Sequence, residues 1–202
     1  MIISQDKPFE EILELLQDHR AIFIIGCNTC ASKLHVGGEE EILKMRSGLE
    51  DAGKDVIGWA LPTAACSIRS WEHLAEKDRS IEKADAVLVM ACGSGASVIS
   101  RVTDMQVYTS NNTTSLGGIF KGEILPDQCK MCGSCIISNF GGICPTAQCP
   151  KNLLNGPCGG CANGKCETDP DKDCAWEVIY LKLKEMNRLD LVEKIYQPRE
   201  NK

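Results

Sequence analysis

Cysteines are the residues of this chain whose number and spacing could support chemistry, since there are thirteen of them and nine fall between positions 129 and 174. The stretch CKMCGSC has the spacing C-x2-C-x2-C, which is typical of the first three ligands of a [4Fe–4S] cluster. Gly133 permits the tight turn that such a loop needs. A zinc site rarely uses three thiols this close together, so we expect Cys129, Cys132 and Cys135 to hold an iron–sulfur cluster.

The six later cysteines supply enough thiols to complete this cluster and to build a second one. Two Cys–Pro pairs follow, Cys144–Pro145 and Cys149–Pro150, and in two-cluster ferredoxins such a cysteine ligates the other cluster. The division we favour gives Cys149 to the first cluster and a second set to the other: Cys144, Cys158, Cys166 and Cys174. Cys161 is left without a metal in this division. In a competing interpretation Cys158 and Cys161 form a zinc-type CxxC pair.

The other four cysteines each follow a stretch that reads as a buried strand. Cys27 and Cys30 lie in GCNTC, Cys66 in LPTAAC and Cys92 in ACGSG. Because the carboxyl ends of parallel strands meet at one edge of a sheet, we expect these four thiols to share a metal site.

The metal at this shared site is left open by the residue types. Four thiolates suit tetrahedral zinc as well as an iron–sulfur cluster, and a CxxC beside a strand is also found in redox dithiols. The glycines of CGSGAS offer N–H groups that could hydrogen-bond cluster sulfurs. His35 is close enough in sequence to be a fifth candidate, although an exposed loop position is the simpler interpretation.

The elements that must position the upstream thiols alternate between helix and strand over residues 1–118. Short apolar runs predict strands, and apolar residues at helical spacing predict helices between them. We expect strands at 21–26, 55–61, 86–91 and 105–109, and helices at 8–18, 37–53, 67–85 and 95–104. Right-handed crossovers then give a small open doubly wound parallel sheet, hence an α/β fold.

Residues 119–202 read differently. Up to Cys174 the chain is rich in Gly, Pro, Asn and Cys with almost no periodicity, so we expect an irregular segment that is organised by metal clusters. A C-terminal helix is predicted over 174–195. Its apolar face around Trp176 and Ile179 could dock a partner, but packing against its own domain is the favoured use.

Composition excludes several classes of protein. The chain has 202 residues with a net charge of −6 and a pI near 5.2, which argues against nucleic acid as a partner. No apolar run is long enough to cross a membrane, and the acidic start lacks the features of a signal peptide. We therefore expect a cytoplasmic protein, in which thirteen cysteines serve metals rather than disulfides.

Two long stretches, GGICPTAQCPKNLLNGPCGGCANGKCE and DKDCAWEVIYLKLKE, resemble the MetV family, the small subunit of methylenetetrahydrofolate reductases of acetogenic and related anaerobes. GCNTC, HVGGEEEI and ADAVLVMACGSG also look like that family. The resemblance implies an electron-transfer role in one-carbon metabolism. A partner subunit with a flavin would reduce methylenetetrahydrofolate to methyltetrahydrofolate, and a further electron-donating subunit or a ferredoxin would supply electrons.

The residues agree with a non-catalytic redox subunit. The chain shows no G-x-G-x-x-G fingerprint, no nucleophile with a base, and no carboxylate pair for acid–base work. We expect two [4Fe–4S] clusters in 119–174 and a third cluster or zinc at Cys27, Cys30, Cys66 and Cys92. The alternatives are a zinc-dependent methyl-transfer or binding module and a structural zinc protein.

Overall fold

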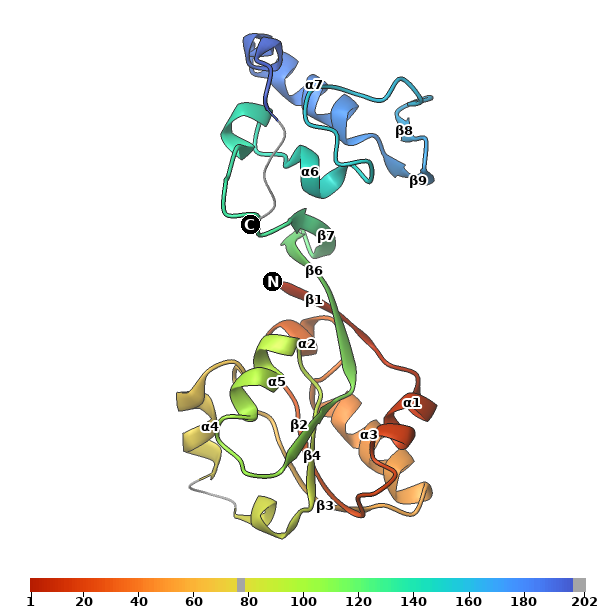
Figure 1. Cartoon of the computed structure of the whole chain (residues 1–202), viewed down its shortest axis with the longest axis vertical. Coiled ribbons are helices and arrows are strands. Elements are labelled where there is room, and N and C mark those ends of the chain that lie inside the picture. Colours follow the sequence, from red (N-terminus) through yellow and green to blue (C-terminus); the bar gives the residue numbers. More distant parts are fainter. Residues whose placement is uncertain (76–78, 198–202) are drawn as a thin grey trace. The chain divides into compact units, whose positions relative to one another are not determined.

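The computed structural model describes residues 1–75 and 79–197, and the chain separates into two compact units, Met1–Thr114 and Ser115–Lys202. The first unit is built on a parallel four-stranded sheet with the order β3-β2-β4-β5 (Figure 1). The strands are β2 (Ala21–Ile25), β3 (Asp55–Ala60), β4 (Ala86–Val89) and β5 (Gln106–Thr109). The predicted α/β fold with a parallel sheet is confirmed.

Helices cover both faces of this sheet because its central strands are apolar on both sides. Ile22 and Ile24 of β2 pack with α1 (Phe9–Leu15) and α3 (Glu39–Asp51) in one core. Phe23 and Ile25, which point the other way, pack with α2 (Cys30–Lys33), α4 (Ile68–Ala75), η1 (Ser80–Lys83) and α5 (Gly93–Ile99). Alternation along one strand thus feeds two separate cores.

The strand order reverses between β2 and β4, and in open α/β sheets ligands bind beyond the carboxyl ends of the strands at such a switch point. The loop after α2 closes over this edge. Gly37 lies so near β4's end that a Cβ there would be 2.0 Å from the carbonyl oxygen of Met90. Only glycine fits at this close approach of two backbones.

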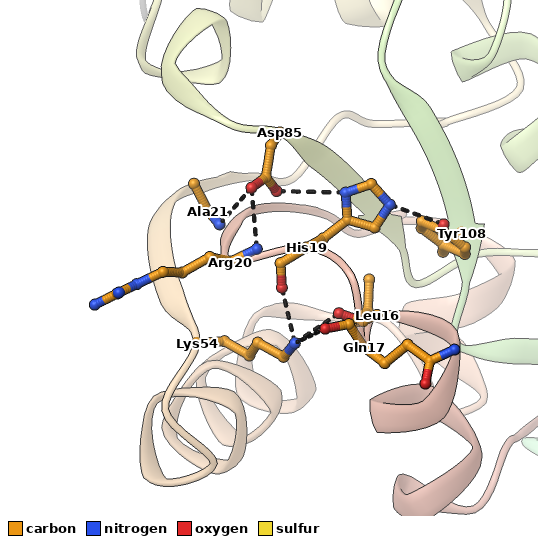
Figure 2. A network of polar contacts seen from close by, with 8 residues as sticks. All are labelled: Leu16, Gln17, His19, Arg20, Ala21, Lys54, Asp85 and Tyr108. Carbon is orange, nitrogen blue, oxygen red and sulfur yellow. Dashed lines mark hydrogen bonds and ion pairs between the residues drawn. The ribbon is translucent and has the colours of Figure 1, made fainter.

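Polar contacts hold the opposite, amino-terminal edge of the sheet (Figure 2). The carboxylate of Asp85 accepts hydrogen bonds from the backbone N–H groups of Arg20 and Ala21, at 3.0 and 3.2 Å. His19 lies 3.7 Å from Asp85 and 2.9 Å from the hydroxyl of Tyr108. These contacts tie the starts of β2 and β4 to the middle of β5.

Lys54 closes the carboxyl end of α1 at the same edge (Figure 2). Its ammonium donates to the carbonyl oxygens of Leu16, Gln17 and His19 at 2.6, 3.3 and 2.8 Å. The last turn of α1 contains no basic residue of its own. A lysine from just before β3 therefore provides the positive charge that the helix end favours.

The second unit contains short elements around a small core. Strand β6 (Asn111–Phe120) begins in the first unit and forms an antiparallel hairpin with β7 (Glu123–Cys129); the order of that sheet is β1-β6-β7, with β1 at Ile2–Asp6. The remaining elements are η2 (Ile137–Phe140), α6 (Pro145–Gln148), β8 (Lys165–Cys166), β9 (Asp169–Asp173), α7 (Ala175–Glu185) and η3 (Leu189–Glu193).

The core of the second unit consists of Phe140, Trp176, Ile179 and Leu183, with Cys174 beside them. Phe140 meets the Trp176 ring edge-on with centroids 5.6 Å apart. Trp176 is 5% exposed and Ile179 is fully buried, so the apolar face of α7 packs against its own unit, as favoured above.

Three sequence expectations need correction. The region after 119 is not uniformly irregular, because it contains the β6–β7 hairpin and several short elements. The predicted helix over 67–85 consists of α4 and the 3-10 helix η1, and positions 76–78 lie outside the described residues. The C-terminal helix ends at Glu185, and the chain continues into a 3-10 helix. Across the residues described, no helix has the length and apolarity to span a membrane.

Candidate metal centres

The four upstream thiols lie where the sheet topology predicts, just beyond the carboxyl ends of three strands. Cys27 follows β2 and Cys30 begins α2. Cys66 lies between β3 and α4, and Cys92 precedes α5 as its N-cap residue. Cys27 is buried, Cys66 is exposed, and the other two are half-buried.

Backbone contacts hold the loops that carry these thiols against one another. The N–H of Cys27 donates to the carbonyl of Gly37 at 2.9 Å, and the N–H of Asn28 donates to that of Pro62 at 3.0 Å. Gly95 of α5 approaches Ala65 so closely that a Cβ would lie 3.0 Å from the methyl group of Ala65. The loops after β2, β3 and β4 therefore form one surface.

The thiols on this surface are near enough to influence one another electrostatically. Burial raises the pKa of the Cys66 thiol above its ordinary value, and negative charge on three neighbouring thiols raises it further. Those neighbours are Cys27, Cys92 and Cys30. The structure thus places Cys66 within electrostatic range of the three other cysteines, and a shared metal site stays a prediction.

Two neighbouring features differ from the expected cluster loop. The N–H of Gly93, in the CGSGAS stretch, donates to the hydroxyl of Thr113 at 2.8 Å rather than facing the thiols. His35 has a side chain 82% exposed, and its Nδ1 lies 3.6 Å from the carboxylate of Glu41. His35 therefore takes the exposed loop position that was the simpler interpretation.

In the second unit, the CKMCGSC loop has a backbone suited to wrapping around a cluster. Met131 and Gly133 both adopt left-handed conformations, with φ of 53° and 71°. The N–H of Met131 donates to the sulfur of Cys129 at 3.3 Å, the type of N–H···S bond that tunes iron–sulfur clusters. Three exposed thiols project from this loop: Cys129, Cys132 and Cys135.

Cys161 and Cys174 form a second group with Glu177. Both thiols line a cavity of about 480 Å³ together with Trp176, Tyr180 and four other residues. Cys161 donates a hydrogen bond to the carboxylate of Glu177 at 3.1 Å. That bond, burial and the nearby Cys174 together raise the pKa of Cys161 to about 12. Our preferred division assigned no metal to Cys161. The structure places this thiol beside Cys174, a predicted ligand of the second cluster.

The other thiols of this unit have separate polar partners. Cys158 donates to Glu167 at 3.2 Å, and Glu167 also pairs with Lys151. Hydrogen bonds from the Thr168 side chain and backbone lower the pKa of Cys166 below its ordinary value. Cys144 and Cys149 flank α6 at its two ends, and Cys149 packs on the same core as Cys161 and Cys174.

The donor set suits thiolate-bound metals, because all thirteen cysteines are free thiols. Within the described ranges, however, no three His, Cys, Asp or Glu side chains are already gathered closely enough to hold a metal ion. The strand-end loops and the CKMCGSC loop each carry several thiols. Among the described residues, these thiols do not surround a common position that a metal ion could occupy. The binding of clusters and the division of the thiols between them stay predictions.

Sequence reasoning missed the Cys161–Glu177 contact. The spacing of Cys158 and Cys161 was a signal for the thiol, since CxxC pairs commonly bind metals. Nothing in the sequence indicated the carboxylate, because Glu177 reaches Cys161 only through the packing of α7.

Comparison with known families concerns the second unit. Residues 108–202 match the family described as methylene-tetrahydrofolate reductase C terminal. This segment is therefore similar to the C-terminal part of methylene-tetrahydrofolate reductases. The match begins within β5 and includes nine of the thirteen cysteines. No curated protein and no solved structure matches the chain.

Proposed function

We propose that this chain is the electron-transfer subunit of a methylenetetrahydrofolate reductase, a small subunit of the MetV type. The observation that carries the proposal is the coincidence of two features in one segment. Residues 108–202 match the reductase C-terminal family, and the same segment contains the CKMCGSC loop with its left-handed turns and exposed thiols.

The thiols of the second unit are assigned to two [4Fe–4S] clusters. Cys129, Cys132, Cys135 and Cys149 would hold one, and a second set would hold the other: Cys144, Cys158, Cys166 and Cys174. Such clusters, when bound, accept and donate single electrons. The chain itself supplies the thiolates, the N–H group of Met131 that bonds to Cys129, and the apolar shelter of Trp176 beside Cys174.

The strand-end thiols are assigned to a third cluster or a zinc ion. The sheet supports this assignment because it places Cys27, Cys30, Cys66 and Cys92 around one edge. A partner subunit would carry the flavin and the folate chemistry, and a further subunit or a ferredoxin would deliver electrons. The complex is proposed to work in the cytoplasm.

A second candidate function is a zinc-binding structural or methyl-transfer module. It is favoured by the direct approach of Cys161 to Cys174 and Glu177. Thiols in mutual contact suit a single tetrahedral ion, whose ligands surround one atom, better than a cubane whose ligands bind separate irons.

Metal analysis of anaerobically purified protein tests these functions. Iron, sulfide and zinc are measured on one sample, and the dithionite-reduced protein is then mixed with the flavin-bearing partner. We expect about eight to twelve irons per chain and reduction of the flavin. About eight irons with one zinc would assign the strand-end site to zinc. Zinc without iron would contradict the electron-transfer function and favour the second candidate.

A further inference from the structure

A cavity of about 490 Å³ lies between α1 and α3 and contains both charged and apolar residues. Asp6 and Lys7 come from the end of β1, and Met90 follows β4. Phe9 and Ile12 belong to α1, His35 to the loop after α2, and the rest to α3: Glu40, Glu41, Lys44, Met45 and Gly48. The cavity thus lies at the carboxyl edge of the sheet, where ligands bind in doubly wound folds.

Three carboxylates line this cavity, those of Asp6, Glu40 and Glu41, and those of Asp6 and Glu41 repel each other. Burial raises the pKa of Asp6 above its ordinary value, and the negative charge of Glu41 raises it further, whereas Lys44 acts in the opposite direction. One oxygen of Asp6 accepts a hydrogen bond from the buried amide of Asn111 at 3.2 Å. A cation between Asp6 and Glu41 would relieve this repulsion.

The neighbouring groups fix these carboxylates in place. Glu41 accepts a hydrogen bond from the N–H of Gly38 at 2.8 Å, and its side chain is only 18% exposed. The Asn111 amide that binds Asp6 also donates to the carbonyl of Val36 at 2.9 Å. Asp6 and Glu41 are therefore held before any ligand arrives, which reduces the entropy cost of binding.

The two lysines of the cavity differ. Lys7 is already paired with Glu11 on α1, and its side chain is 14% exposed. Lys44 lines the same cavity, and its positive charge acts to lower the pKa of Asp6. A ligand that carries an ammonium group and a carboxylate on the same carbon atom would match this arrangement.

Beside these charged groups and His35, the lining includes four apolar side chains. They belong to the core or to the residues packed on it: Phe9, Ile12, Met45 and Met90. The two methionines are flexible and can adapt their shape to an aliphatic chain. A purely polar metabolite would leave this surface wet. An aliphatic chain attached to a charged head group would cover it.

We propose that this cavity binds an α-amino acid with an apolar side chain, with its ammonium group between Asp6 and Glu41, its carboxylate at Lys44, and its side chain against Phe9, Met45 and Met90. The site uses none of the thiols. It goes beyond the proposed electron-transfer function and does not depend on it.

Calorimetric titration of the full chain with L-norleucine tests the proposal. Hexanoate and pentylamine are matched probes, since each keeps the aliphatic chain but lacks the ammonium or the carboxylate. We expect saturable binding of norleucine. The affinity for either probe should be lower by about tenfold or more. The absence of norleucine binding would overturn the proposal. Equal binding of pentylamine or of hexanoate would also overturn it, because one charged group would then suffice.

Substitutions locate the site. Asp6→Asn keeps the shape of the side chain and Lys44→Met keeps its apolar stem, and each is expected to weaken norleucine binding about tenfold or more. Glu10→Gln and Lys83→Met, at exposed positions outside the lining, serve as controls that bind as the unmodified chain does. If Asp6→Asn does not fold, Glu41→Gln tests the same ammonium position. Unchanged binding in the folded variants would overturn the proposal.

Discussion

The two units of this chain position their cysteines in different ways. In the first unit, thiols follow strands such as β2 and β4, where residues 22–25 and 86–89 are buried. In the second unit, three thiols project from an exposed loop whose turns depend on Met131 and Gly133. A packed sheet therefore fixes one group of thiols without a metal, whereas the loop that carries the other group is exposed.

This difference predicts unequal dependence on metal. The strand-end loops should keep their conformation when metal is removed, because backbone hydrogen bonds and buried strands hold them. The loops of the second unit should lose theirs, since in such segments metal binding is part of the folding free energy. Four experiments could break or sharpen this contrast.

The largest effect is expected for Cys132→Ser. Loss of one ligand from the CKMCGSC loop should remove about four irons and leave residues 119–174 open to protease, while the first unit stays resistant. Iron analysis and limited proteolysis measure the two effects. Ser134→Ala, in the same loop, is the control and should retain all iron. Unchanged iron in Cys132→Ser would contradict the assignment of this loop.

The next largest effect concerns the small core of the second unit. Phe140 is 1% exposed, and Phe140→Ala should lower the free energy of unfolding of this unit by about 3–5 kcal/mol. Phe120→Ala is a matched control at the hairpin tip, where the ring is 58% exposed. Denaturant unfolding measures both. Equal destabilisation by the two changes would show that the Phe140 core contributes little and that metal alone organises the unit.

A smaller structural effect is expected at the strand ends. Cys66→Ser should abolish metal binding at that site. In metal-free protein, however, the free energy of unfolding of the first unit should change by less than about 0.5 kcal/mol, because the thiol is exposed. Metal analysis and calorimetry measure the two quantities. Strong destabilisation of the metal-free first unit would instead show that Cys66 is a packing residue.

A small effect, on stability alone and with no change in metal content, is expected from the polar contacts of the first unit. Burial acts to raise the pKa of Asp85, but hydrogen bonds from the N–H groups of Arg20 and Ala21 and the nearby His19 outweigh it and lower this pKa. A carboxyl group whose pKa is lowered by folding stabilises the protein above its unfolded pKa of about 3.9. That stabilisation is lost as the pH falls through the lower, folded value.

Asp85→Asn should therefore reduce stability at pH 7 by less than about 1 kcal/mol, because the side chain is 46% exposed and solvent screens its charge. The melting temperatures of the two proteins should converge below pH 3.9, approximately the pKa of an unfolded aspartate. Melting curves recorded from pH 2 to pH 7 measure the difference in melting temperature between the two proteins. This difference should be complete at about pH 5 and above. A constant difference at every pH would mean that charge is not involved.

The sequence predicted the first unit well because its signals are local. Continuous apolar runs such as Ile22–Ile25 have few alternatives to a buried parallel strand, and parallel strands bring their carboxyl ends together. The grouping of Cys27, Cys30, Cys66 and Cys92 followed from that topology alone, without any knowledge of side-chain contacts.

The second unit was predicted less well because its signals are weak or distant. The β6 strand is rich in Thr, Ser and Gly, with little alternation. Its turn consists of Lys121 and Gly122, which take left-handed conformations with φ of 51° and 88°, as two-residue hairpins require, but Lys–Gly is not one of the dipeptides that signal such a turn. The contact of Cys161 with Glu177 and the cavity near Asp6 depend on how helices pack, which local patterns do not specify.

The contacts of Lys54 have a consequence for the order of folding. Helix α1 has seven residues, too few to persist alone in water. The ammonium that caps its end comes from a residue 38 positions later than Leu16 in the chain. Helix α1 should therefore become stable only after α3 has formed and β3 has begun to pair with β2, although it comes earlier in the sequence. A folding transition state with little structure in α1 and much in β2 and β3 is the kinetic signature of this arrangement.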